Sequence, residues 1–189
     1  MSEYLSASER RRLSLLKEQK YPTDGPKKSY VDARERIRAF AIQRQPLSIA
    51  GMRDHEAEII QCLVDNEWAP PAPQSSRPPT RDRELLVEGV EIKAYPDLLC
   101  SDPQSGRDGA IKFYFGKSAP LDPSVAQHMA TVLYYFEREI MTNQRVHPSL
   151  CAVYDVRQDV EYIASKSTKR LMGNIEAACT FIKAVWPGL

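Results

Sequence analysis

The sequence predicts an α/β protein in which a mixed β-sheet is flanked by helices and preceded by a helical N-terminal extension. Two observations support this fold class. Apolar residues recur at helical spacing up to about residue 67, and after a proline-rich stretch they alternate with polar residues as in strands. From residue 52 the predicted order is helix, three strands, helix, two strands, helix, which is typical of a mixed sheet covered by helices. We expect a basic helical extension over residues 1–50 and an α/β core over residues 51–189.

Three helices are predicted in the first 67 residues. The first covers residues 8–20, with Ser6 and Glu9 as a capping box, and ends before Pro22. The second runs from Tyr30 to about Gln43. The third covers residues 52–67 and carries an apolar stripe made of Met52, Ile59, Ile60, Leu63 and Val64.

A proline-rich loop is predicted over residues 69–83. Residues 70–79 hold five of the 14 prolines, which excludes a helix there and favours an extended chain. Strands are predicted beyond it, over residues 84–95 with a turn at Gly89, over 96–100, and over 110–115, where Ile111, Phe113 and Phe115 share one face.

The C-terminal third continues this alternation of helices and strands. Asp122 followed by Pro123 predicts a helix start, and that helix is expected to reach about Thr142. Two strands over residues 149–156 and 160–164 follow, and a last helix runs from about Ser167 to before Pro187.

The formal net charge of +1 conceals a gradient along the 189 residues. Residues 1–45 hold 11 Lys and Arg against 6 Asp and Glu, whereas the remainder holds 15 against 19. A basic arm of this kind can approach DNA phosphates or an acidic partner. No apolar run has the length of a membrane span, the N-terminus has no secretory pattern, and we expect a cytoplasmic protein that does not enter a membrane. The four cysteines lack CxxC spacing, which argues against zinc and iron–sulfur sites.

One pair of residues carries a possible chemistry. Pro96-Asp97 enters a predicted strand and Lys112 lies on the next, within the order helix, three strands, helix, strand. Over residues 52–156 this arrangement resembles the PD-(D/E)XK nuclease superfamily, with its restriction-endonuclease-like and RecB-like branches. The resemblance implies that Asp97 and a second acid hold Mg²⁺ or Mn²⁺, while Lys112 positions or activates the attacking water; Asp97 and Lys112 are then the catalytic residues.

The motif departs from the superfamily at the second acid. That position is Ala110, which offers no oxygen to a metal. Asp108 falls in the preceding turn, and Glu58 on the third helix is the candidate replacement as a metal ligand beside Asp97. His55, and Gln127 with Tyr134, resemble elements of the RecB-like branch. Lys117, Arg107 and Gln127 are candidate contacts to nucleic acid.

Each of these residues also has an ordinary structural interpretation, since Asp97 can bond backbone amides and Lys112 can extend to solvent. Two functions therefore remain open. One is a metal-dependent nuclease acting on DNA. The other, favoured by Ala110, is a non-catalytic scaffold or accessory subunit of a larger assembly, such as a defence or mobile-element complex, with a protein partner or a second copy of the chain. Beside these two, a small-molecule enzyme or binding protein on an α/β scaffold has no motif in its support, and it survives only because fold does not fix function.

Overall fold

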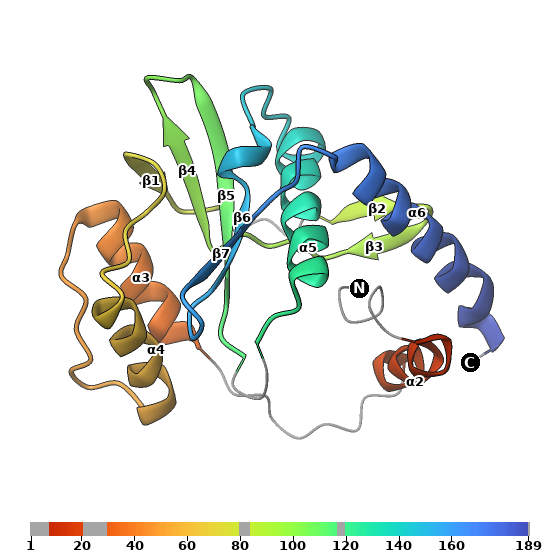
Figure 1. Cartoon of the computed structure of the whole chain (residues 1–189), viewed down its shortest axis with the longest axis horizontal. Helices are drawn as coiled ribbons and strands as arrows, with labels where there is room; N and C mark the ends of the chain where they lie inside the picture. Colours follow the sequence, from red (N-terminus) through yellow and green to blue (C-terminus); the bar gives the residue numbers. More distant parts are fainter. Residues whose placement is uncertain (1–7, 21–29, 80–83, 117–119, 189) are drawn as a thin grey trace.

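A five-stranded mixed sheet forms the centre of the protein (Figure 1). The computed structural model describes residues 8–20, 30–79, 84–116 and 120–188. In spatial order the strands are β1 (Gln74–Ser76), β4 (Leu98–Asp102), β5 (Arg107–Tyr114), β6 (Ala152–Asp155) and β7 (Val160–Ile163). β5 and β6 are parallel, and the other neighbouring pairs are antiparallel. The predicted fold class, a mixed sheet flanked by helices, is confirmed.

Two helices, α3 (Val31–Gln43) and α4 (Asp54–Asp65), cover one face of the sheet (Figure 1). Ile37 of α3 and Ile59 of α4 are fully buried, in one core cluster with Ile111 and Phe113 of β5. The alternation seen in residues 110–115 thus predicts the buried face of β5 correctly. Although α3 precedes the expected division at residue 50, it packs on the same core as α4, and the division itself stays a prediction.

The opposite face of the sheet is covered by α5 (Pro123–Tyr135), which connects β5 to β6. The helix begins as predicted: Val125 donates its backbone N–H to Oδ1 of Asp122 at 3.0 Å, and Pro123 is the first helical residue. The helical segment reaches Ile140, close to the predicted end at Thr142, but after Tyr135 it continues as a π-helix, η1 (Phe136–Ile140), which the sequence did not indicate. Such wide turns often occur near functional sites.

A hairpin of β2 (Leu85–Val87) and β3 (Val90–Ile92) forms a separate small sheet. Its turn contains Gly89 at φ +81°, a backbone conformation that suits glycine, as expected. The hairpin does not supply the first strand of the central sheet, so that part of the prediction is wrong. Its buried residues Leu85 and Ile92 pack instead against α5 and α6 (Thr168–Val185).

The place of that first strand is taken by β1, which lies inside the proline-rich stretch and pairs with β4. The stretch is extended, as predicted. The sequence did not indicate that residues 74–76 would form a strand of the central sheet.

The two ends of the described chain meet beside α6. Leu16 of α2 (Glu9–Lys20) is buried against Ala178 and Ile182 of α6. Lys20 donates to the carbonyl oxygen of Trp186, which begins the short helix η3 (Trp186–Gly188), at 2.8 Å. A further short helix, η2 (Pro148–Leu150), precedes β6. None of the helices in the described ranges combines the length and the apolar character needed to cross a membrane.

Candidate functional site

Asp97 lies at the entrance to β4 and is 4% exposed. Its backbone N–H donates to the carbonyl oxygen of Ile111 at 2.7 Å, and its carboxylate oxygen Oδ2 accepts the backbone N–H of Phe113 at 2.9 Å. Asp97 therefore continues the β4–β5 hydrogen-bond ladder by one residue before Leu98, the first residue of β4. These contacts fix the carboxylate at one end of the central sheet.

Three cationic side chains surround this carboxylate. Arg34 donates through Nε to Oδ1 at 2.9 Å, and Nζ of Lys112 lies 3.5 Å from Oδ2. Arg38 places Nη2 3.8 Å from Oδ1 and donates through Nε to the carbonyl oxygen of Asp97 at 2.8 Å. We call Asp97, Arg34, Arg38 and Lys112 the Asp97 cluster. With Lys112 protonated, three cations and one carboxylate leave a formal excess of two positive charges.

The two arginines owe their position to the buried stripe of α3. Ala33, Ile37 and Ala41 are buried at four-residue spacing, and Arg34 and Arg38 follow the first two of them along the helix. Residues four apart lie one above the other on a helix, so both guanidinium groups reach the same strand end. Arg34 also lies over the ring of Phe115, 4.9 Å from its centre.

An outer layer of charge adjoins the cluster. Arg38 donates to Oε1 of Glu35 at 2.6 Å, and Arg77 pairs with the other carboxylate oxygen of Glu35. Arg77 is the most accessible of these cations, with 54% of its side chain exposed, against 29% for Arg34. The cationic surface therefore extends from the buried carboxylate outward to solvent.

Lys112 is held on the other side of the cluster. Its Nζ donates to the carbonyl oxygen of Tyr95 at 2.7 Å. Burial lowers the pKa of Lys112, an effect that the neighbouring Asp97 opposes and that Arg34 and Arg38 reinforce. The predicted convergence of Asp97 and Lys112 thus exists in space.

The second acid that a metal site needs is missing from this place. Ala110 is fully buried in β5 opposite Leu99 of β4. Both oxygens of Asp97 already accept hydrogen bonds, and a divalent cation here would meet three positive side chains. Among the residues that the structure describes, no group of three His, Cys, Asp or Glu is placed to hold a metal ion. The donor set therefore does not fit Mg²⁺ or Mn²⁺, which take several oxygen ligands.

Glu58 does not replace the missing acid. It lies on the exposed side of α4, and its Oε2 accepts from Nη2 of Arg157, after β6, at 3.2 Å. The buried acid of α4 is Glu56, two residues earlier. Its Oε1 accepts the backbone N–H groups of Asp32 and Ala33 at 3.0 and 3.3 Å, so Glu56 caps the start of α3.

The candidate nucleic-acid contacts are dispersed. Arg107 is exposed at the opposite end of β5 from Lys112, about 17 Å away for five residues of strand. Gln127 is exposed on α5, and Lys117 lies outside the described residues. Asp108 lies within β5 and not in the preceding turn as expected, and its Oδ1 accepts from Oγ of Ser101 and Nη2 of Arg145.

The two further RecB-like candidates have structural partners. His55 packs its ring edge-on against Tyr30, with 5.3 Å between the ring centres. The hydroxyl of buried Tyr134 accepts from Arg138 at 2.9 Å.

A buried acid that the sequence did not single out lies in the π-helix. Glu137 is 2% exposed, and its Oε1 has no hydrogen-bond partner among the described residues. Burial raises the pKa of Glu137 to about 7, and nearby Asp108 adds to this while Asn143 opposes it.

Some of the missed residues left a signal in the sequence. Glu56 precedes Ile59, Ile60 and Leu63 at helical spacing, so it falls on the apolar face of α4, whereas Glu58 does not. Arg34 and Arg38 form a basic pair beside an apolar stripe, but nothing local to them indicates Asp97 as their partner.

No family model, curated protein or solved structure matches this chain.

Proposed function

We propose that this chain is a DNA-binding protein with a PD-(D/E)XK nuclease-like fold that does not cleave DNA. The observation that carries the proposal is the Asp97 cluster. In it, protein cations neutralise the first acid of the motif, and Ala110 stands where the second acid would be. A carboxylate in these surroundings is a structural anchor for positive side chains rather than a metal ligand.

The arrangement of elements supports the fold relationship. The superfamily order of helix, three strands, helix and strand corresponds to α4, β1, β4, β5, α5 and β6, all within one helix-flanked sheet. Asp97 stands at the start of the second of these strands and Lys112 lies on the third, as the resemblance implies.

The charge distribution supports DNA as the partner. The Asp97 cluster has a formal excess of positive charge, and Arg34, Lys112 and Arg77 are all partly exposed to solvent. Guanidinium groups bind phosphate oxygens in a bidentate manner, and such contacts release counterions from DNA. Binding should then be insensitive to sequence and should weaken steeply with salt.

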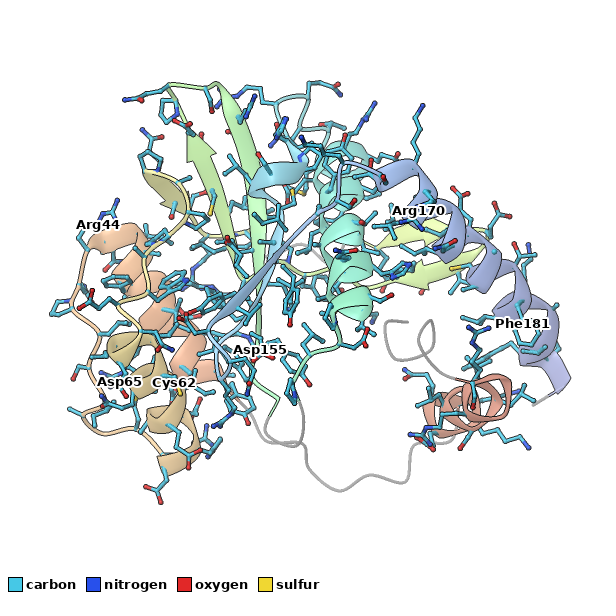
Figure 2. All side chains as sticks on the ribbon, in the orientation of Figure 1. Arg44, Cys62, Asp65, Asp155, Arg170 and Phe181 are labelled. Atoms are coloured by element: carbon cyan, nitrogen blue, oxygen red, sulfur yellow. The ribbon has the colours of Figure 1, made fainter. Side chains whose placement is uncertain are left out.

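The binding test uses fluorescence anisotropy with a labelled 20-base-pair duplex at several salt concentrations. We expect the Arg77→Ala and Arg34→Gln variants to bind more weakly than wild type, each with a log K against log salt slope smaller by about 1. Arg170→Ala is the matched control, because this exposed arginine of α6 lies far from α3 (Figure 2). Equal affinity for wild type, Arg77→Ala and Arg34→Gln would contradict the site. An absence of binding at low salt would contradict DNA as the partner and favour the accessory-subunit alternative.

The catalytic test measures plasmid cleavage with Mg²⁺ or Mn²⁺. We expect wild type and Asp97→Ala to show the same background, because the donor set for the metal is incomplete. Metal-dependent cleavage by wild type that disappears in Asp97→Ala would show that the protein is an active nuclease and would overturn the proposal.

A further inference from the structure

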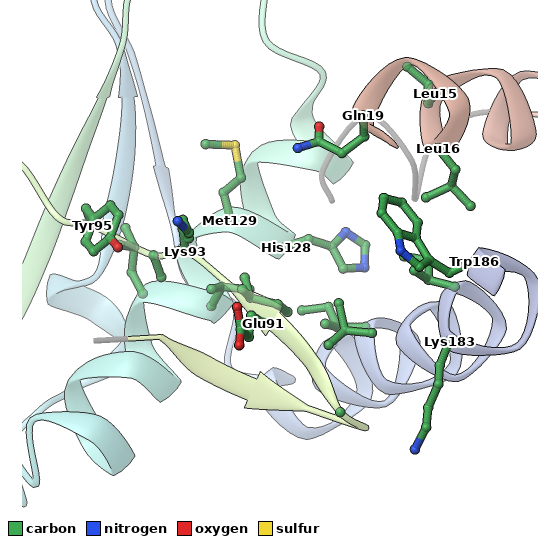
Figure 3. Close-up of a pocket in the computed structure, with 18 of the residues that line it drawn as sticks. Leu15, Leu16, Gln19, Glu91, Lys93, Tyr95, His128, Met129, Lys183 and Trp186 are labelled. Carbon is green, nitrogen blue, oxygen red and sulfur yellow. The ribbon is translucent and has the colours of Figure 1, made fainter. Parts of the chain in front are cut away.

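A cavity of about 810 Å³ lies between α2, the β2–β3 hairpin, α5 and the C-terminal helices (Figure 3). Cavities that bind small molecules usually measure about 300–1,000 Å³ and are mainly apolar with few polar groups. Side chains from five separate elements form apolar walls here, among them Leu16, Ile92, Met129, Leu133, Ile182 and Trp186.

One buried polar side chain lies in the wall of this cavity. His128 of α5 is 7% exposed, and Figure 3 shows its ring pointing from α5 toward Trp186. Its Nδ1 lies 2.7 Å from the carbonyl oxygen of Ser124. A carbonyl oxygen only accepts hydrogen bonds, so Nδ1 carries the proton, and Nε2 of the neutral ring is an acceptor. That Nε2 is buried and has no partner among the described residues.

Four charged side chains line the cavity, and each has a partner outside it or points away from it; exposed Glu91 is hydrogen-bonded to Glu84. Lys112 donates to the carbonyl oxygen of Tyr95 and belongs to the Asp97 cluster. Lys93 lies 3.3 Å from Glu84, and Lys183 extends away from the cavity (Figure 3). An ionised ligand would therefore lose water without gaining a dedicated counter-charge, which favours an uncharged occupant.

We propose that this cavity binds an uncharged aromatic small molecule that donates a hydrogen bond to Nε2 of His128. Trp186 and Met129 in the walls suit an aromatic ring, since indole rings and thioethers both make favourable contacts with aromatic faces and edges. A hydroxyl or N–H on that ring satisfies the buried Nε2 of His128, for which the described residues offer no hydrogen-bond donor. Of the four residues of the Asp97 cluster, Lys112 alone also lines this cavity, so ligand binding and DNA binding can be tested separately.

The test uses two naphthalene probes, in one of which a methyl group replaces the hydrogen of the donor. 2-Naphthol carries a hydroxyl, whereas 2-methoxynaphthalene has the same rings and no donor. Titration calorimetry with the full chain should give a dissociation constant of about 0.1 mM for 2-naphthol, as expected for a ligand of this size. The ether should bind about tenfold more weakly, because it leaves Nε2 unsatisfied.

A variant of His128 then tests whether the preference for 2-naphthol depends on Nε2. His128→Phe keeps an aromatic ring and removes the acceptor, and it should bind both probes within about twofold of each other. Ile163→Ala, an exposed position of β7, is the control and should retain the preference for 2-naphthol.

The proposal is overturned if 2-naphthol does not bind at millimolar concentration, or if wild type binds the two probes equally. It is also overturned if His128→Phe folds and keeps the tenfold preference. Displacement of 2-naphthol by the DNA duplex would assign the cavity to DNA and would likewise overturn it. The comparison of the two probes on wild type needs no variant, so it remains decisive if His128→Phe does not fold.

Discussion

Replacing Asp97 with asparagine should destabilise the protein by about 2–3 kcal/mol. Removing one partner of a buried ion pair costs about 3–5 kcal/mol, because the remaining charge is left uncompensated. Here the side chains of Arg34 and Lys112 are 29% and 28% exposed, so water screens part of that cost. Asparagine keeps an oxygen for the backbone N–H of Phe113, and that hydrogen bond is retained. For a chain of this length the loss corresponds to a fall in Tm of about 4–12 °C.

The measurement is thermal and urea unfolding of wild type and Asp97→Asn under the same conditions. Glu58→Gln is the control, because the Glu58 carboxylate is 45% exposed even though its partner Arg157 is only 16% exposed, and the change should cost less than Asp97→Asn. An Asp97→Asn variant as stable as wild type, or more stable, would refute the reasoning. Such a result would indicate that the Asp97 carboxylate lowers the stability of the fold and is kept for a function, as functional acids often are. A rise in the Tm of wild type with Mg²⁺ that is absent from Asp97→Asn would point to a metal site.

Three further outcomes test other parts of the structure. Because the pKa of Glu137 is raised to about 7 from its ordinary 4.5, ionising this carboxyl costs stability as the pH rises from about 5 to 8. In urea unfolding over that pH range, the free energy of unfolding of Glu137→Gln should therefore rise relative to that of wild type by up to about 3 kcal/mol. Gly109→Ala should destabilise the protein severely, since an added Cβ would lie 2.0 Å from the carbonyl oxygen of Leu150. Gly173→Ala, in the open interior of α6, should instead stabilise it by about 0.5–1 kcal/mol, and similar Tm values for the two variants would contradict the packing. Burial raises the pKa of three of the four thiols, Cys100, Cys151 and Cys179, to about 11 or 12. Mass spectrometry after alkylation of the native protein should therefore find label mainly on half-buried Cys62, and uniform labelling of all four would contradict the fold.

The parts of the fold that the sequence predicts are those with local causes. Asp122 and Pro123 define the start of α5 because capping depends on neighbouring residues. Alternation along residues 110–115 defines which side of β5 is buried, and it places Lys112 on the face away from Ile111. The spacing of the motif brings Asp97 and Lys112 together because antiparallel strands pair in a fixed register.

The parts that could not be predicted depend on contacts between distant residues. Arg34 and Arg38 precede Asp97 by 63 and 59 residues, and no local pattern specifies that pairing. Distant contacts also decide that residues 74–76, and not the β2–β3 hairpin, form the first strand of the central sheet. The hairpin has the stronger strand pattern, yet its apolar residues pack on α5 and α6, and the weaker segment pairs with β4.

The prolines around β1 also bear on how the protein behaves at high concentration. β1 is an outer strand, so one side of its backbone has no neighbouring strand in the sheet, and such edges can recruit strands from other molecules. Pro73 precedes its three residues, and Pro78 and Pro79 follow shortly after them, and none of these prolines has a backbone N–H to donate. Another copy could add few hydrogen bonds there, which protects the sheet from growing into fibres or aggregates. The prolines of a segment that resembles a simple linker thus limit the addition of strands at the β1 edge of the sheet.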